Sequence, residues 1–159
     1  MINLNGNSSS SRQVTFITHP SIQSKAFASY LSETLMAPVV LQNINKPLAQ
    51  RLAKDSVILF DIAVSNKKLN GVWRDIIRLQ ADNPRLLIIN SAQKYELYEM
   101  AQWPALYGVF RHDDDESRLI EGVKAVLNGE QTAELSVMHP AMYAADHASA
   151  PVENSPLTE

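Results

Sequence analysis

The chain has 159 residues, of which 45% are hydrophobic and 19% are charged, a balance typical of a folded globular domain. Its net charge of −3 and its isoelectric point near 5.8 exclude nucleic-acid binding driven by bulk positive charge. Because the chain contains no cysteine, disulfides and thiolate metal sites are excluded as well.

The composition divides the chain into three parts. Residues 1–12 are polar and include a serine run, so we expect a disordered N-terminal arm without a signal peptide. Residues 13–130 form the predicted domain, and residues 131–159 are expected to be a linker helix and tail that lead to an effector domain absent from this sequence. No run approaches the roughly 18 apolar residues of a membrane span, which favours a soluble, cytoplasmic protein.

Short apolar runs and helical periodicities alternate through the first half of the domain. A β-branched and aromatic run predicts a buried strand over 14–18, and a helix capped by Ser21 follows it. The segment 38–41 is typical of a second strand. A proline followed by two leucines at helical spacing predicts a short helix over 47–52.

The same alternation continues in the second half. The strongest strand pattern covers 57–62, and an amphipathic helix follows it over 69–79. A fourth buried strand is predicted over 86–89, a weaker helix over 93–102 and a fifth strand over 106–110.

The last regular element has clear boundaries. Acidic residues at 113–116 are expected to mark a helix start, where the helix dipole favours negative charge, and Asn128 with Gly129 is expected to end the helix. Five apolar strands that alternate with helices predict an α/β fold with a doubly wound, five-stranded parallel sheet. The natural strand order is 2-1-3-4-5, which is flavodoxin-like or receiver-like.

Binding and catalytic sites of such sheets form beyond the carboxyl ends of the strands. The residues that the sequence puts there are Thr18, His19, Asp61, Asn90, Ser91, Arg111 and His112. Asp61 ends the central strand, where a carboxylate can accept a phosphoryl group or hold a cation, so it is the phosphoacceptor candidate. The candidates for a switch region are Ser91, Arg111 and His112.

The surroundings of Asp61 argue against phosphorylation. The metal that assists phosphoryl transfer needs more than one hard oxygen ligand, yet the first strand offers only Thr18 and His19. Arg111 and His112 occupy the end of the fifth strand, where a lysine would meet the phosphoryl group. The alternative role of Asp61 is a strand-end carboxylate that caps the next turn.

Other chemistry has little support in the sequence. The four histidines have no metal-ligand spacing, and the chain lacks the glycine-rich loops that cradle phosphates. We therefore predict no catalytic residue, no resident metal and no cofactor. A further hypothesis is that the protein is a small flavodoxin-like enzyme that uses a cofactor. We rank it below the two functions described next.

Several short motifs resemble one family of regulators. They are Asn66-Lys67-Lys68-Leu69 with Trp73, Trp103-Pro104, Gly108-Val109-Phe110 followed by a triple Asp at 113–115, and the segment from Ala125 to Glu130. Over residues 14–130 the chain resembles the receiver-like N-terminal domain of CsgD/VpsT-type transcription regulators of the LuxR/FixJ family. In that family a linker helix and a helix-turn-helix domain follow the receiver-like domain.

The resemblance implies a degenerate receiver domain that regulates and dimerises a transcription factor for biofilm, curli and extracellular-matrix genes, and that is not an enzyme. The final Leu157-Thr158-Glu159 resembles the first residues of the family's helix-turn-helix signature, so DNA is expected to be bound only through that missing domain. Asp61 matches the aspartate that the family retains. The alternative function is therefore a phosphorylation-competent response regulator, with Mg²⁺ as cofactor and acetyl phosphate or a histidine kinase as donor.

The resemblance also bears on ligand and partner. The vibrio branch binds cyclic di-GMP through a Trp-x-Thr/Ser-Arg motif, whereas this chain has Gln131-Thr132-Ala133-Glu134 there, without the aromatic ring or the cation. We therefore expect no cyclic di-GMP binding. A homodimer is expected, either through a face within 94–127 or through the linker at 131–147.

Overall fold

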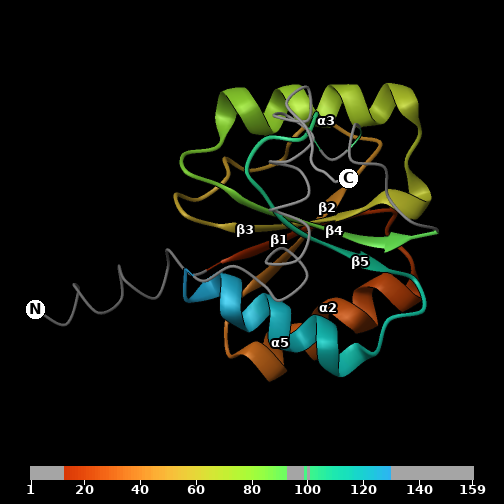
Figure 1. Cartoon of the computed structure of the whole chain (residues 1–159), viewed down its shortest axis with the longest axis vertical. Coiled ribbons are helices and arrows are strands. Elements are labelled where there is room, and N and C mark those ends of the chain that lie inside the picture. Colours follow the sequence, from red (N-terminus) through yellow and green to blue (C-terminus); the bar gives the residue numbers. More distant parts are fainter. Residues whose placement is uncertain (1–12, 93–98, 100, 130–159) are drawn as a thin grey trace, which may run out of the picture.

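The computed structural model describes residues 13–92, 99 and 101–129. The sheet is parallel throughout, with the order β2-β1-β3-β4-β5, which confirms the predicted fold class. Figure 1 shows α3 on one face of the sheet and α2 with α5 on the other. The strands are β1 (Val14–Thr18), β2 (Val39–Asn43), β3 (Val57–Asp61), β4 (Arg85–Ser91) and β5 (Leu106–Arg111). The helices are α2 (Ile22–Leu35), the 3₁₀ turn η1 (Ile62–Val64), α3 (Lys67–Gln80) and α5 (Glu116–Leu127).

The sheet separates two apolar cores. All five residues of β3 are buried, and alternate residues point to opposite faces. Ile58 and Phe60 belong to the core that includes Trp73 of α3, whereas Val57 and Leu59 belong to the core on the other face of the sheet. Burial on both faces explains why the strands have continuous apolar sequences rather than alternating ones.

Local hydrogen bonds fix the helix ends. Ser21 and Ser24 form a reciprocal capping box at the start of α2, and the side chain of Asn66 accepts from the backbone N–H of Leu69 in α3. At the end of α5, Gly129 takes a left-handed conformation with φ of 85°, as the predicted Asn-Gly cap requires.

The helix predicted over 47–52 is wrong. These residues form an irregular connection between β2 and β3 that is held by the buried side chain of Gln42. The amide oxygen of Gln42 accepts from the backbone N–H of Ala49 at 2.9 Å, and its amide nitrogen donates to the carbonyls of Asn43, Lys46 and Pro47. Leu52 is buried without a helix, so the spacing of the leucines reflects anchoring of a loop to the core.

Some predicted elements fall outside the described residues. They are most of the helix over 93–102, the arm at 1–12 and the linker and tail at 131–159. The strand predicted over 57–62 is one residue shorter than expected, because Ile62 already begins η1. Among the helices of the described ranges, none has the length and apolar character that crossing a membrane requires.

Candidate functional site

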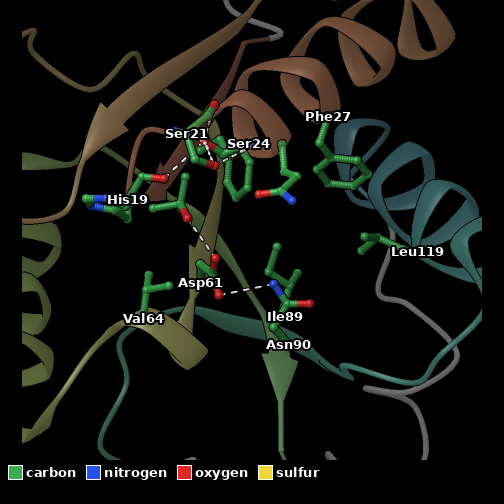
Figure 2. A pocket seen from close by; sticks show the side chains of 12 residues that line it. His19, Ser21, Ser24, Phe27, Asp61, Val64, Ile89, Asn90 and Leu119 are labelled. Atoms are coloured by element: carbon green, nitrogen blue, oxygen red, sulfur yellow. Dashed lines mark hydrogen bonds between the residues drawn. The ribbon is translucent and has the colours of Figure 1, made fainter.

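A cavity of about 510 Å³ opens at the carboxyl end of the sheet, between the strand ends and α2. Asp61 at the end of β3 lines it, together with residues from β1, β4 and the two helices of that face (Figure 2). Its walls are formed by Phe16, Thr18, His19, Ser21, Gln23, Ser24, Phe27, Asp61, Val64, Ile89, Asn90 and Leu119. The expectation that sites form at the carboxyl ends of the strands therefore located the cavity. The sequence gives no indication that Phe27 and Leu119, which lie on helices, also line it.

Asp61 is 7% exposed, and its carboxylate accepts three hydrogen bonds. Thr18 Oγ1 donates to Oδ2 at 2.7 Å, and Asn90 Nδ2 donates to Oδ1 at 3.1 Å (Figure 2). The backbone N–H of Ala63 also donates to Oδ1, at 3.2 Å, so Asp61 caps the turn η1. The capping role considered for this residue is confirmed, and the carboxylate joins the ends of three neighbouring strands.

Asn90 reaches Asp61 from an irregular part of the sheet. Its φ of 63° is left-handed, a conformation that asparagine tolerates better than most residues. The pairing of β4 with β5 shifts register between Ile88 and Ser91, which is where Asn90 lies. The irregularity breaks the alternation of the strand at the residue whose amide meets the carboxylate.

The cavity lacks the ligands of a receiver-type Mg²⁺ site. Among the described residues that line it, Asp61 is the only carboxylate, and the first strand ends in Thr18, followed by His19. Within the described ranges, no three acidic or histidine side chains are grouped so that they could hold a metal. A single carboxylate that already accepts three hydrogen bonds does not fit Mg²⁺, which needs a nearly complete octahedron of oxygen ligands.

The switch-region candidates lie near the cavity but do not converge on Asp61. Ser91 is buried, and its backbone carbonyl accepts from the N–H of His112 at 2.9 Å. Arg111 and His112 line an adjacent space of about 170 Å³, which shares Asn90 with the Asp61 cavity. The residues that the sequence predicted as one site therefore divide between two neighbouring spaces.

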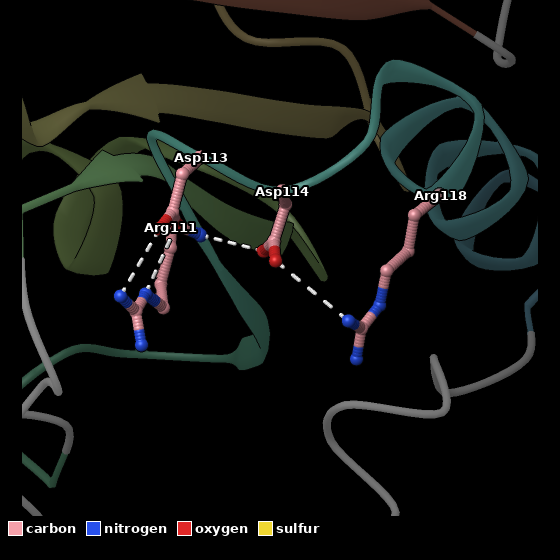
Figure 3. A network of polar contacts seen from close by, with 4 residues as sticks. All are labelled: Arg111, Asp113, Asp114 and Arg118. Carbon is pink, nitrogen blue, oxygen red and sulfur yellow. Dashed lines mark hydrogen bonds and ion pairs between the residues drawn. The ribbon is translucent and has the colours of Figure 1, made fainter.

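Arg111 has a carboxylate partner of its own. Its Nε and Nη2 atoms lie 3.2 Å from the two carboxylate oxygens of Asp113, while Asp114 accepts from its backbone N–H at 2.7 Å (Figure 3). Asp114 also forms an ion pair with Arg118 of α5 at 3.7 Å. The acidic run thus pairs with nearby arginines, and the guanidinium of Arg111 is engaged away from Asp61.

A tyrosine links the two helices that flank the cavity. Interaction of the Tyr30 hydroxyl on α2 with the carboxylate of Glu116, at the start of α5, raises the pKa of Tyr30 above its usual 10.0. The interaction connects α2 with α5, and Glu116 also lines the smaller of the two spaces.

Comparison with known proteins identifies the domain. Residues 20–133 match the model of the receiver domain of VpsT-like proteins. The chain belongs to the VpsT-like receiver domain family. The family resemblance inferred from the sequence motifs is therefore confirmed.

Curated relatives of this VpsT-like receiver domain are transcription regulators. The chain is 32% identical to the CsgBAC operon transcriptional regulatory protein of Escherichia coli, over 72% of the chain and 52% of that protein. It is 29% identical to the "Probable csgAB operon transcriptional regulatory protein" of Salmonella typhimurium, over 77% of the chain and 56% of that protein. The chain spans about half the length of these relatives.

Solved structures agree with this assignment. The regulatory domain of the master biofilm regulator CsgD superposes with a TM-score of 0.74 at 27% identity, covering 81% of this chain and 98% of that domain. The response regulator ChrA of a haem-sensing two-component system superposes with a TM-score of 0.54 at 19% identity, covering 91% of this chain and 69% of that chain, and shows the shared fold alone.

Proposed function

We propose that this domain is the regulatory and dimerisation part of a cytoplasmic transcription regulator that controls curli, biofilm and other extracellular-matrix genes, without enzymatic activity of its own. The observation that carries the proposal is the arrangement around Asp61. Its carboxylate is held by the neutral donors Thr18 and Asn90, and none of the other described residues that line the cavity is acidic. The curated relatives are named as regulators of csg operons, which supports curli genes as the proposed targets. DNA would be bound by a helix-turn-helix domain outside this sequence.

The experiment that tests the proposal asks whether phosphorylation, or its chemical mimic, changes the protein. The oligomeric state and amide spectrum of residues 1–159 are recorded with and without beryllofluoride and Mg²⁺, and acetyl phosphate is tested for covalent labelling. We expect neither treatment to change the protein. A change that Asp61→Asn abolishes would instead support the alternative, a phosphorylation-competent receiver. That alternative draws support from the position of Asp61 at the end of the central strand, beside an open cavity.

Cyclic di-GMP is not expected to be the signal. The stretch Gln131-Thr132-Ala133-Glu134 offers neither an aromatic ring for stacking on guanine nor a cation for its phosphates. Titration calorimetry should give no micromolar isotherm with cyclic di-GMP. A clear isotherm would mean that other residues of this chain replace the family's motif.

The outer face of α2 supports dimerisation better than that of α5. Ile22 and Met36, at its two ends, are 88% and 91% exposed, and the small, exposed residues Ala26 and Ser29 lie between them on one stripe of the helix. Exposed large apolar side chains on one face are typical of an interaction surface. The exposed positions of α5 are mainly charged or polar, and residues 94–98 and 100 of the predicted face within 94–127 lie outside the described residues.

The sequence of α2 is complementary to itself when two copies run antiparallel. With Ser29 at the two-fold axis, Ile22 lies opposite Met36 of the partner copy. The same axis sets Lys25 opposite the partner copy's Glu33. A two-fold interface repeats each contact, so one pairing of opposite charges occurs twice. The small side chains of Ala26 and Ser29 near its centre leave room for the helices to approach closely.

A charge exchange tests this interface. Light scattering after gel filtration should show a dimer for the unmodified chain, a shift toward monomer for Lys25→Glu and a restored dimer for Lys25→Glu combined with Glu33→Lys. The matched control is Lys68→Glu on the exposed part of α3, which should not change the mass. A strict monomer at high concentration, or a dimer indifferent to Lys25→Glu, would contradict the proposed role of α2.

A further inference from the structure

The carboxylate of Asp61 has no cationic partner among the described residues, although it is 7% exposed. Arg111, which lies at the same edge of the sheet, forms its ion pair with Asp113. A buried charge held only by neutral donors remains incompletely compensated, because desolvation removes more than such donors return. A cation that enters the cavity would supply the missing charge.

Two oxygen acceptors lie side by side in the cavity, Asp61 Oδ2 and Thr18 Oγ1. Asp61 Oδ2 accepts one bond, from Thr18, so it has capacity for another, and Thr18 Oγ1 can itself accept. Asn90 donates with its amide nitrogen, and Figure 2 shows its amide oxygen on the side away from Asp61. An ammonium group has three N–H donors and no acceptor, so it can donate to both Asp61 and Thr18.

Part of the cavity lining is apolar. Figure 2 shows Phe27 of α2 and Leu119 of α5 to one side of the Asp61–Asn90 pair. Phe16, whose ring packs against Phe27, and Ile89 also line the cavity. A volume of about 510 Å³ lies within the usual range for small-molecule pockets, and an apolar wall with a few convergent polar groups is their usual composition. A hydrated metal ion would leave this wall unused.

We infer that the Asp61 cavity binds an amphipathic organic ammonium ion, with its amine on Asp61 and Thr18 and its hydrocarbon or aromatic part on Phe27 and Leu119. An organic anion fits less well, because Asp61 repels it and the N–H of Ser24 in the first turn of α2 is already bonded to Ser21. The inference deepens the proposed function, since such a ligand would be the signal that a non-phosphorylated regulatory domain reads.

Titration calorimetry with residues 1–159 tests the inference with three compounds that share one tail. Phenethylamine carries the ammonium group, 2-phenylethanol is its neutral counterpart and 3-phenylpropionate is an anion. We expect saturable binding of phenethylamine. The affinity for the other two compounds should be lower by about tenfold or more, because the free energy of a hydrogen bond to a charged group corresponds to a factor of this size. Asp61→Asn should lower the affinity for phenethylamine by a similar factor. Asp75 is an exposed carboxylate on α3, so Asp75→Asn should leave the affinity unchanged.

NMR spectra of the unmodified protein provide a second test, which is needed if Asp61→Asn does not fold. Phenethylamine should shift the side-chain amide resonances of Asn90 and leave those of Asn70, on α3, in place. Equal binding of 2-phenylethanol, unchanged affinity in Asp61→Asn, or no binding and no shift at Asn90 would each overturn the inference. A response to Mg²⁺ but not to the amine would also overturn it, in favour of a metal site. Dimerisation is measured without ligand, so the proposed function and the ligand class can fail separately.

Discussion

Replacing Gly122 by alanine should destabilise the domain, although alanine normally favours a helix. Gly122 lies in α5 against the buried ring of Phe110 in β5. A Cβ atom at this position would lie 2.5 Å from Cζ of the ring and 3.3 Å from both Cε atoms. Because carbon atoms pack at about 3.5 to 4.0 Å, the ring or the helix must move by roughly 1 Å. Phe110 is 1% exposed, so the ring has little free space into which to move.

The magnitude follows from two opposing terms. Glycine-to-alanine replacement inside a helix gains about 1 kcal/mol, and forcing an extra methyl group into a packed core costs about 1 to 3 kcal/mol. The close approach to Cζ puts Gly122→Ala toward the upper part of that cost, so we expect a net loss of about 1 to 2 kcal/mol in the free energy of unfolding. Gly71→Ala in α3 is the matched control, because its Cβ would meet only the end of the Arg74 side chain, at 3.9 Å. It should gain about 0.5 to 1 kcal/mol.

Urea unfolding followed by circular dichroism measures both variants. Phe110→Leu removes the ring atoms that approach Gly122, so Gly122→Ala should cost little or nothing in that background. If Gly122→Ala stabilises the unmodified domain as Gly71→Ala does, the packing argument is refuted. An undiminished cost in the Phe110→Leu background would locate the strain elsewhere in α5.

Three further outcomes can be measured on the same domain. Trp73→Phe removes the indole N–H that donates to the carbonyl of Ile44 at 2.9 Å, and should cost about 1 to 3 kcal/mol in urea unfolding, because the carbonyl is left buried and unpaired. Gln42→Ala should cost a similar, roughly 1 to 3 kcal/mol, amount and expose the loop between β2 and β3 to limited proteolysis, since the amide holds that loop. Tyr30 should ionise above pH 10.0 in a spectroscopic titration compared with Tyr30→Phe, and Glu116→Gln should lower its pKa toward the ordinary value. Because this pKa is raised in the folded state, the contribution of Tyr30 to stability should be complete below pH 10.0 and lost as the pH rises through the folded pKa.

The sequence was sufficient for the sheet because its strands are buried on both faces. Apolar runs such as the one at 57–61 can be recognised without knowledge of their neighbours. The connection at 47–52 could not be predicted in the same way. Its leucines have helical spacing, but the backbone groups of the loop bond to the side chain of Gln42, and nothing in a single sequence indicates that pairing.

For the site as well, the sequence predicts which residues lie together but not which side chains bond to one another. The rule that sites form at strand ends brought Thr18, Asp61 and Asn90 together correctly, since the ends of parallel strands share one edge of the sheet. The rule could not say which side chains would pair. Whether Arg111 turns toward Asp61 or toward Asp113 depends on the path of the loop after β5, and the acidic run there offers a nearer partner.

The cavity and the exposed face of α2 are connected by a short stretch of chain. Thr18, which bonds to Asp61, is the last residue of β1, and Ile22, at one end of the exposed stripe, begins α2. Between them the carbonyl of His19 accepts from the hydroxyl of Ser24, which fixes the first turn of the helix to the strand end. A ligand on Thr18 that alters this turn would alter the surface on which two copies meet. Linkage then requires reciprocity, because a ligand that strengthens dimerisation by some factor must bind the dimer more tightly by that factor. Amine titrations above and below the dimer dissociation constant should therefore give different affinities, and equal affinities would mean that the cavity and α2 act independently.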